Sequence, residues 1–189
     1  MRRKRLYSKP AKNCRSDKIR VAYMRWTGGR RAVSSGMLQV GQSFMKCQLG
    51  RNGMAHRKRE GDQKTPRGRF RILFGFFRRD RVKRPSCQIP LGALKPTDIW
   101  SDDPTDFSYN RLRRAPARFR HENLWMEEQQ YDLVFVLSHN IKPRVLGRGS
   151  AIFLHILGKT DHTSGCIALS PAALRKTLQR LSARASLVI

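Results

Sequence analysis

Apolar residues cluster in short runs along this chain and do not form the long 3.6-residue periods of a helical protein. The runs at 69–77, 131–137 and 150–155 are rich in branched and aromatic side chains, and stretches containing Gly and Pro separate them. Runs of this length and composition predict strands buried on both faces. We therefore expect a buried strand at 69–77 and two central strands at 131–137 and 150–155, the latter pair separated by a turn region.

Shorter patterns add further strands at the two ends of this region. Residues 37–40 and 43–49 are rich in strand-forming residues and flank a Gly41–Gln42 turn, a pattern typical of paired strands. The last four residues, 186–189, have the composition of a closing strand.

One helix is indicated near the end of the chain. Ser170 is a favoured helix N-cap, and Pro171 is suited to the first helical position. Leu174, Leu178 and Leu181 then fall on one face. The sequence therefore predicts a mainly β fold, a β-rich α+β domain with one clear helix and long loops.

Charge and composition divide the chain into two parts. Residues 1–31 hold 12 basic residues and one acidic residue without a sustained apolar period, so we predict a flexible basic amino-terminal arm. Residues 32–189 form the predicted folded domain. Within it, 57–68 has the composition of a loop, and 85–130 is predicted to be a long irregular excursion, which in proteins is usually functional or disordered.

The net charge of +27 is concentrated in residues 1–84, which carry +22, whereas 85–189 carry +5. A field of this size attracts polyanions in general, so nonspecific polyanion binding through residues 1–84 is expected alongside a purely solubilising role. Nothing in the sequence indicates an oligomeric state.

Several classes of protein are disfavoured by what the sequence lacks. No apolar stretch reaches the length of a membrane span, and the basic start is not followed by the apolar region of a signal peptide. The four cysteines lie 33, 40 and 79 residues apart, which is not the spacing of a zinc knuckle, and no disulfide pairing is favoured.

The chemistry is concentrated between the predicted strand ending at His155 and the helix starting near Ser170. Cysteine attacks as a thiolate, so Cys166 needs a base within reach, and His155 can supply it. Gly165 lets the backbone approach a substrate closely, and the amides around Cys166 can face a developing oxyanion. A metal site built from His155, His162 and Cys166 is the alternative, but a fourth ligand and the usual spacing are missing.

This segment resembles the signature of the L,D-transpeptidases, the YkuD-domain family, in which a strand-end histidine is followed by Ser/Thr-His-Gly-Cys. His155 matches the histidine, Thr163 the hydroxyl residue, Gly165 the glycine and Cys166 the cysteine. Further stretches from residue ~33 to the end are similar to a short proteobacterial branch of the family. These stretches are 58–62, the Thr-Pro-Arg-Gly-Arg-Phe segment at 65–70, Tyr109–Asn110, Asn140 and 149–155.

Two residues depart from the family pattern. Ser164 replaces the second histidine of the motif, and Ala168 stands where many members have Asn or Arg. His162 can take over a role of the missing histidine. These departures concern substrate orientation more than the nucleophile and the base.

The resemblance implies a β-sandwich catalytic domain that acts on peptidoglycan stem peptides through a Cys166 thioester, with His155 as the base and no metal or organic cofactor. Family members make 3,3 or 1,3 cross-links, exchange D-amino acids or hydrolyse peptides, and generally accept carbapenems. The resemblance also implies roles in substrate positioning or oxyanion binding, which we assign to Gly165, Ser164, Thr163, His162, Asn140 and Tyr109. It implies a role in cell-wall biogenesis and cell shape, and a location in the cell envelope or periplasm. The alternative from another class is a basic nucleic-acid-binding protein, although no recognition motif for nucleic acid is present.

Overall fold

The computed structural model describes residues 16–23 and 34–189, and strands make up most of its regular structure. The elements are β1 Ser16–Tyr23, β2 Ser35–Val40, β3 Ser43–Gln48, β4 Met54–Ala55, β5 Thr65–Pro66, β6 Arg69–Phe77, β7 Leu91–Ala93, β8 Asp98–Ser101, β9 Leu112–Arg114, β10 His121–Asn123, the 3₁₀ helix η1 Gln129–Tyr131, β11 Leu133–Leu137, β12 Phe153–Ile156, β13 Ile167–Leu169, α1 Pro171–Gln179 and β14 Leu181–Val188. The predicted mainly β fold with one α-helix is confirmed for the part of the chain that is described.

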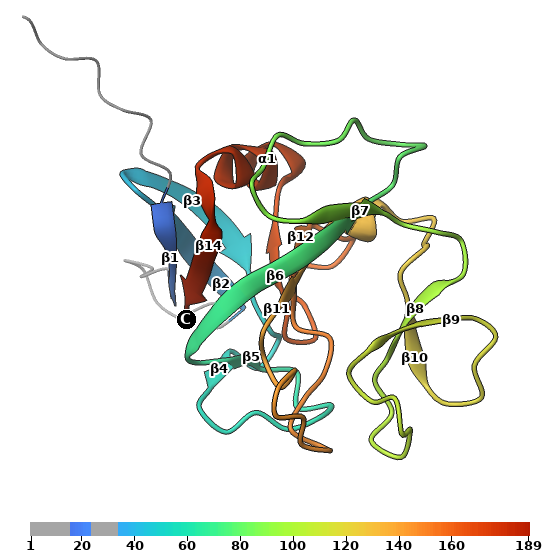
Figure 1. Cartoon of the computed structure of the whole chain (residues 1–189). Coiled ribbons are helices and arrows are strands. Elements are labelled where there is room, and N and C mark those ends of the chain that lie inside the picture. Colours follow the sequence, from blue (N-terminus) through green and yellow to red (C-terminus); the bar gives the residue numbers. More distant parts are fainter. Residues whose placement is uncertain (1–15, 24–33) are drawn as a thin grey trace, which may run out of the picture.

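Nine of these strands form one sheet in the order β11-β12-β13-β3-β2-β1-β14-β6-β7, and β11 also pairs with β6. This second pairing closes the sheet on itself, as the ring of strands in Figure 1 shows. A smaller sheet of β10, β8 and β9 lies beside β11 and β12, and β4 pairs with β5. The closed sheet encloses the larger hydrophobic core.

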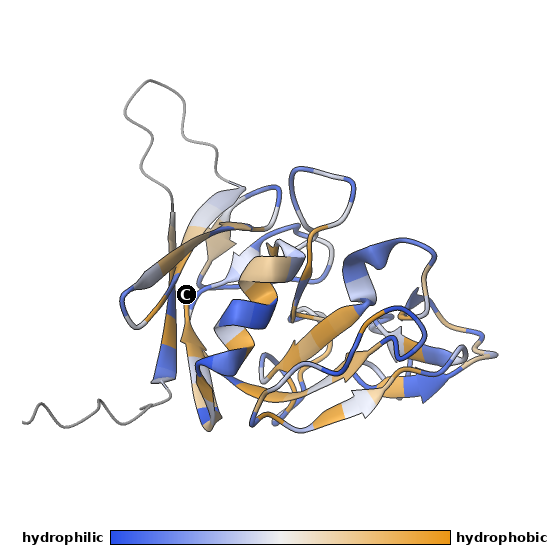
Figure 2. Ribbon diagram, turned by 90° about the horizontal axis from the view of Figure 1, so that it is seen from above, coloured by the Kyte–Doolittle hydropathy of each residue, from blue (hydrophilic) through white to orange (hydrophobic). Residues whose placement is uncertain are grey.

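The predicted helix is confirmed, with one difference at its end. The Ser170 hydroxyl accepts a hydrogen bond from the Ala173 amide at 3.3 Å, so Ser170 is the N-cap of α1. Leu174 and Leu178 are fully buried against the sheet, while the opposite face of α1 is polar (Figure 2). Leu181, predicted on the same helical face, instead begins β14, because α1 ends at Gln179.

The amino-terminal boundary of the domain differs from the prediction. Residues 16–23 were assigned to the flexible arm, but they form β1, which pairs in parallel with β14 and antiparallel with β2. Ile19 and Val21 point into the core between exposed basic residues, and this alternation is that of a half-buried strand. The rest of the predicted arm, 1–15 and 24–31, lies outside the described residues.

The excursion at 85–130 covers the outer face of the central strands. In β11, Leu133, Phe135 and Leu137 face the enclosed core, while Val134 and Val136 pack in a second cluster under this excursion. Both faces of β11 are therefore covered, which explains why its sequence is apolar throughout. The excursion was predicted to be irregular, whereas β7 to β10 form within it.

No helix among the described residues combines the length and apolar character needed to cross a membrane.

Candidate active site

A tight turn places Cys166 at the start of β13. The Thr163 hydroxyl donates to the Cys166 carbonyl at 2.7 Å and accepts from the Gly165 amide at 3.1 Å. The Thr163 amide donates to the Leu49 carbonyl at 2.9 Å, which ties the turn to the chain after β3. Gly165 has a φ of 143°, and a Cβ there would lie 2.8 Å from the Lys64 carbonyl oxygen, so the turn requires glycine.

The thiol of Cys166 points at the residues that precede β12 and begin it. Its Sγ donates to the Ala151 carbonyl at 3.0 Å and accepts from the Phe153 amide at 3.2 Å. Ala151 has a φ of 49°, which non-glycine residues rarely adopt, and its amide donates to the side chain of Asn110 at 3.2 Å. The thiol is therefore oriented by backbone groups that Asn110 helps to hold.

His155 follows Phe153 on the same face of β12, which is the face that Cys166 packs against. β12, which carries His155, pairs in parallel with β13, and Cys166 immediately precedes β13. The imidazole Nδ1 lies 2.7 Å from the Ile156 carbonyl oxygen, and its ring contacts the Tyr131 ring edge-on at 5.3 Å. The hydrogen bonds described for 16–23 and 34–189 do not join His155 directly to Cys166.

Burial dominates the acid–base properties of both groups. It raises the pKa of the Cys166 thiol to about 12, and the negative charge of Glu122 raises that pKa further, whereas the Phe153 amide and the Lys58 ammonium lower it. Burial likewise lowers the pKa of His155 to about 4, although hydrogen bonds with the backbone of Ile156 and Gln130 act to raise it. Both side chains are therefore neutral at pH 7 in this state.

Six of the eight residues predicted for the site line one cavity of about 470 Å³. They are His155, His162, Thr163, Ser164, Gly165 and Cys166. Ser164 is exposed at the surface of this cavity, and His162 Nδ1 lies 2.8 Å from the Asp161 carboxylate. The side chain of Ala168, the second departure from the family pattern, is fully buried.

The other two predicted residues lie outside this cavity and support its surroundings. Tyr109 is fully buried, and its hydroxyl donates to Glu60, which also accepts from the Ser150 hydroxyl at 2.8 Å. The Asn140 amide bonds to both backbone groups of Val145 and to the Gly149 carbonyl, so it shapes the loop between β11 and β12. Asn140 lines a separate cavity of about 980 Å³.

Several polar residues of the cavity wall were not predicted as site residues, among them Lys58, Glu60, Glu122 and Gln130. Lys58 and Glu60 come from the loop between β4 and β5, whereas Glu122 comes from β10 and Gln130 from η1. Glu122 accepts from the Tyr131 hydroxyl at 2.6 Å, and burial raises the pKa of its carboxyl group. Lys58 lies in the 58–62 stretch that resembles the family, but no local pattern marked Glu122.

Metal ligation is the alternative chemistry for these side chains. Within 16–23 and 34–189, no group of three or more His, Cys, Asp and Glu side chains has an arrangement suited to a metal ion.

Comparison with known proteins gives one match. The family model described as the L,D-transpeptidase catalytic domain, YkuD, matches residues 20–189. That range begins inside β1 and includes all the other strands of the closed sheet. No curated protein and no solved structure matches the chain.

Proposed function

We propose that this chain, which belongs to the L,D-transpeptidase (YkuD) catalytic-domain family, transfers acyl groups of peptidoglycan stem peptides through a thioester on Cys166. The observation that carries this proposal is the cavity shared by Cys166 and His155, with the thiol at the end of a fixed turn. A buried thiol, a neutral imidazole and a glycine turn beside a cavity are the parts that cysteine acyl transfer needs. The order of motifs further supports placing the chain in the short proteobacterial branch.

The proposed reaction has two acyl-transfer steps. The thiol first gives its proton to His155, whose neutral imidazole can accept one, and the thiolate attacks an amide carbonyl of the donor peptide. The tetrahedral adduct expels an amine, which takes the proton from His155, and leaves the acyl group on sulfur. A second amine then attacks the thioester, loses a proton to His155 and forms the new amide, while the sulfur leaves as the thiolate and is reprotonated.

The acceptor of the acyl group decides the product. A side-chain amine of a second stem peptide gives a cross-link of the 3,3 or 1,3 type, and we propose cross-linking as the main outcome. A free D-amino acid gives exchange, whereas water gives carboxypeptidase or endopeptidase activity at the same site. We further propose a location in the cell envelope, because family members act on the wall and the proposed acceptor amines are found there.

The experiment uses purified wild-type chain and Cys166→Ala with muropeptides as substrates. We expect complete loss of transfer and hydrolysis in the variant, because no other residue of the cavity can form the thioester. Cys87→Ala serves as the matched control and is expected to retain activity. Retained turnover in a folded Cys166→Ala protein would contradict the assignment of Cys166 as the nucleophile. Cells lacking the gene should also show an altered muropeptide profile.

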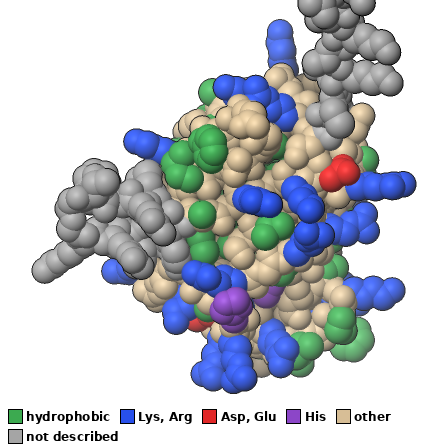
Figure 3. Space-filling model, turned by 90° about the vertical axis from the view of Figure 1, so that its left-hand side faces the viewer, with side chains coloured by type: hydrophobic (Ala, Val, Ile, Leu, Met, Phe, Trp, Pro, Cys, Tyr) green, Lys and Arg blue, Asp and Glu red, His purple; other side chains and the backbone are tan. Residues whose placement is uncertain are grey.

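A second candidate function is nonspecific polyanion binding through residues 1–84. The larger cavity is lined by several basic side chains of this range, among them Arg57, Arg59 and Arg67, and Lys and Arg predominate among the charged groups on the face in Figure 3. Such a surface binds polyanions with an affinity that falls steeply with salt. DNA binding titrated against salt tests this: weak, sequence-independent binding that survives Cys166→Ala would assign it to surface charge, whereas sequence-dependent binding would favour a nucleic-acid-binding protein.

A further inference from the structure

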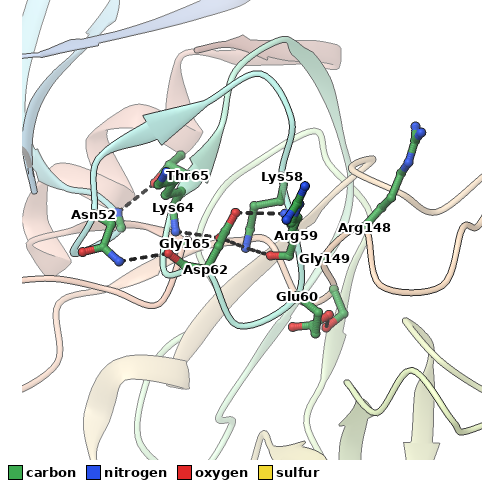
Figure 4. A network of polar contacts seen from close by, with 12 residues as sticks. Asn52, Lys58, Arg59, Glu60, Asp62, Lys64, Thr65, Arg148, Gly149 and Gly165 are labelled. Atoms are coloured by element: carbon green, nitrogen blue, oxygen red, sulfur yellow. Dashed lines mark hydrogen bonds and ion pairs between the residues drawn. The ribbon is translucent and has the colours of Figure 1, made fainter.

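Lys58 is a charged residue enclosed beside the turn that carries Cys166. Its side chain is 5% exposed, although burial of an ammonium group is costly unless something compensates for it. The alkyl chain passes between two glycines that make room for it: a Cβ on Gly149 would lie 2.7 Å from Lys58 Cγ, and a Cβ on Gly165 would lie 3.4 Å from Lys58 Cε. Figure 4 shows Lys58 with both glycines.

The loop around Lys58 fixes the position of the ammonium group. Nζ donates to the Asp62 carboxylate and to the Arg59 carbonyl at 2.8 Å. Asp62 in turn accepts from the amides of Arg59 and Lys64 at 2.8 and 2.9 Å. Among the described residues these are the two acceptors of the Lys58 ammonium, which leaves its third N–H for another group.

Lys58 also belongs to the wall of the cavity that contains Cys166. The groups facing Cys166 come from several elements: Lys58 from the loop after β4, Glu122 from β10, Tyr131 from η1 and His155 from β12. Tyr131 and the imidazole are neutral at pH 7, and Glu122 opposes a negative charge on sulfur. Glu60, Asp102, Arg120 and His162 also line the cavity, and among its charged groups Lys58 is the cation that lowers the pKa of the thiol.

We propose that Lys58 is a positioning residue whose ammonium stabilises the thiolate of Cys166 and thereby sets the pH range in which the sulfur reacts. The proton leaves sulfur for the imidazole of His155, so Lys58 takes no part in the proton transfer. This inference rests on the proposed function only in taking Cys166 as the nucleophile.

The test measures the rate of Cys166 alkylation by iodoacetamide as a function of pH, read by peptide mass spectrometry on the full chain. Replacing Lys58 by Met keeps the length of the side chain and removes the charge. Between pH 7 and 9 we expect the alkylation rate of Lys58→Met to be about tenfold below that of the wild type, because a smaller fraction of the sulfur is thiolate. Lys58→Arg should retain the wild-type rate, and the exposed Lys176→Met is the matched control expected to leave it unchanged.

Asp62→Asn separates the electrostatic role from a structural one. Removing the negative partner leaves the ammonium uncompensated, so the alkylation rate between pH 7 and 9 should rise, opposite to Lys58→Met. A loop that merely anchors the turn would respond to both variants in the same direction, and that result would overturn the proposal. So would an unchanged profile in a folded Lys58→Met protein, and if that variant does not fold, the Asp62→Asn profile decides.

Alkylation does not require a stem peptide, so this test stands apart from the test of the proposed function. If Lys58→Met leaves the alkylation of Cys166 unchanged while the chain is an active transpeptidase, only the present inference is overturned. A clear Lys58 effect on a chain without acyl-transfer activity would remove only the proposed function.

Discussion

Two buried cysteines of the same closed sheet have different surroundings. Cys47 on β3 and Cys166 at the start of β13 are both under a tenth exposed, and burial raises the pKa of each thiol to about 12. Cys47 packs in the enclosed apolar core, where a Cβ on Gly36 would already lie 3.1 Å from its sulfur. Cys166 borders a cavity and feels the charges of Lys58 and Glu122.

The comparison shows that burial and a raised pKa do not by themselves identify a nucleophile. What differs is access and the presence of polar groups that can respond to a charge on sulfur. The Cys47 thiol forms a hydrogen bond with the backbone of Gly36. Cys166 instead accepts a hydrogen bond from the Phe153 amide, and Lys58 and His155 lie around the same cavity. Each prediction below tests one part of this difference.

The largest expected effect is selective acylation of Cys166 by a carbapenem. The cavity admits a small acylating reagent to Cys166, whereas Cys47 is closed off by core side chains. Intact-protein and peptide mass spectrometry should find one added carbapenem mass, on Cys166. Labelling of Cys47 or Cys87 with Cys166 unmodified would move the site elsewhere.

His155→Gln should lower the rate of Cys166 acylation by about 10²- to 10⁴-fold, because the glutamine side chain cannot act as a base. His162→Gln, in the same cavity and with its imidazole 2.8 Å from the Asp161 carboxylate, should cause a smaller loss. Single-turnover kinetics with a chromogenic β-lactam or a muropeptide would measure both. Equal losses in the two variants would mean that His162 shares the role of the base.

Much of the fold was predictable because its signals are local. The strand predicted at 69–77 coincides with β6, and the strands around Gly41 correspond to β2 and β3. β1 was missed because its two inward side chains, Ile19 and Val21, lie in a strongly basic segment. Its place in the sheet depends on pairing with β14 at the other end of the chain, which no local pattern shows.

The site divides in the same way. Cys166 and His155 were predicted because they stand in one short segment with a family signature, and the structure brings both to one cavity. Lys58 belongs to the 58–62 stretch that resembles the family, but its place in the cavity wall, like that of Glu122 on β10, depends on tertiary packing. The β8 to β10 strands that carry Glu122 are three or four residues long, too short to give a periodic signal.

Acid should destabilise the region of Cys166, because His155 must be protonated there. The core around Cys47 contains no such histidine among the described residues. The pKa of His155 is about 4 in the folded chain and about 6.5 when unfolded, so between these values the unfolded state binds more protons. The free energy of unfolding therefore falls as pH drops from about 6.5 to 4, by up to about 3 kcal/mol from this group. Urea unfolding at several pH values should show a weaker dependence in His155→Gln than in wild type or in the exposed control His56→Gln. An identical dependence in all three would contradict the buried neutral histidine.

The smallest expected effect belongs to Cys47→Ala. The substitution removes one sulfur from a packed core, which should lower the free energy of unfolding by about 1 kcal/mol. Because Cys47 has no part in the cavity, the rate of Cys166 acylation should stay at the wild-type value. Urea unfolding and acylation kinetics on the same preparation would separate the two quantities. A folded Cys47→Ala protein with strongly reduced acylation would show that the two cysteine regions are coupled. β13 would be the link, because its Leu169 pairs directly with Cys47. The contrast between a structural and a reactive thiol would then have to be abandoned.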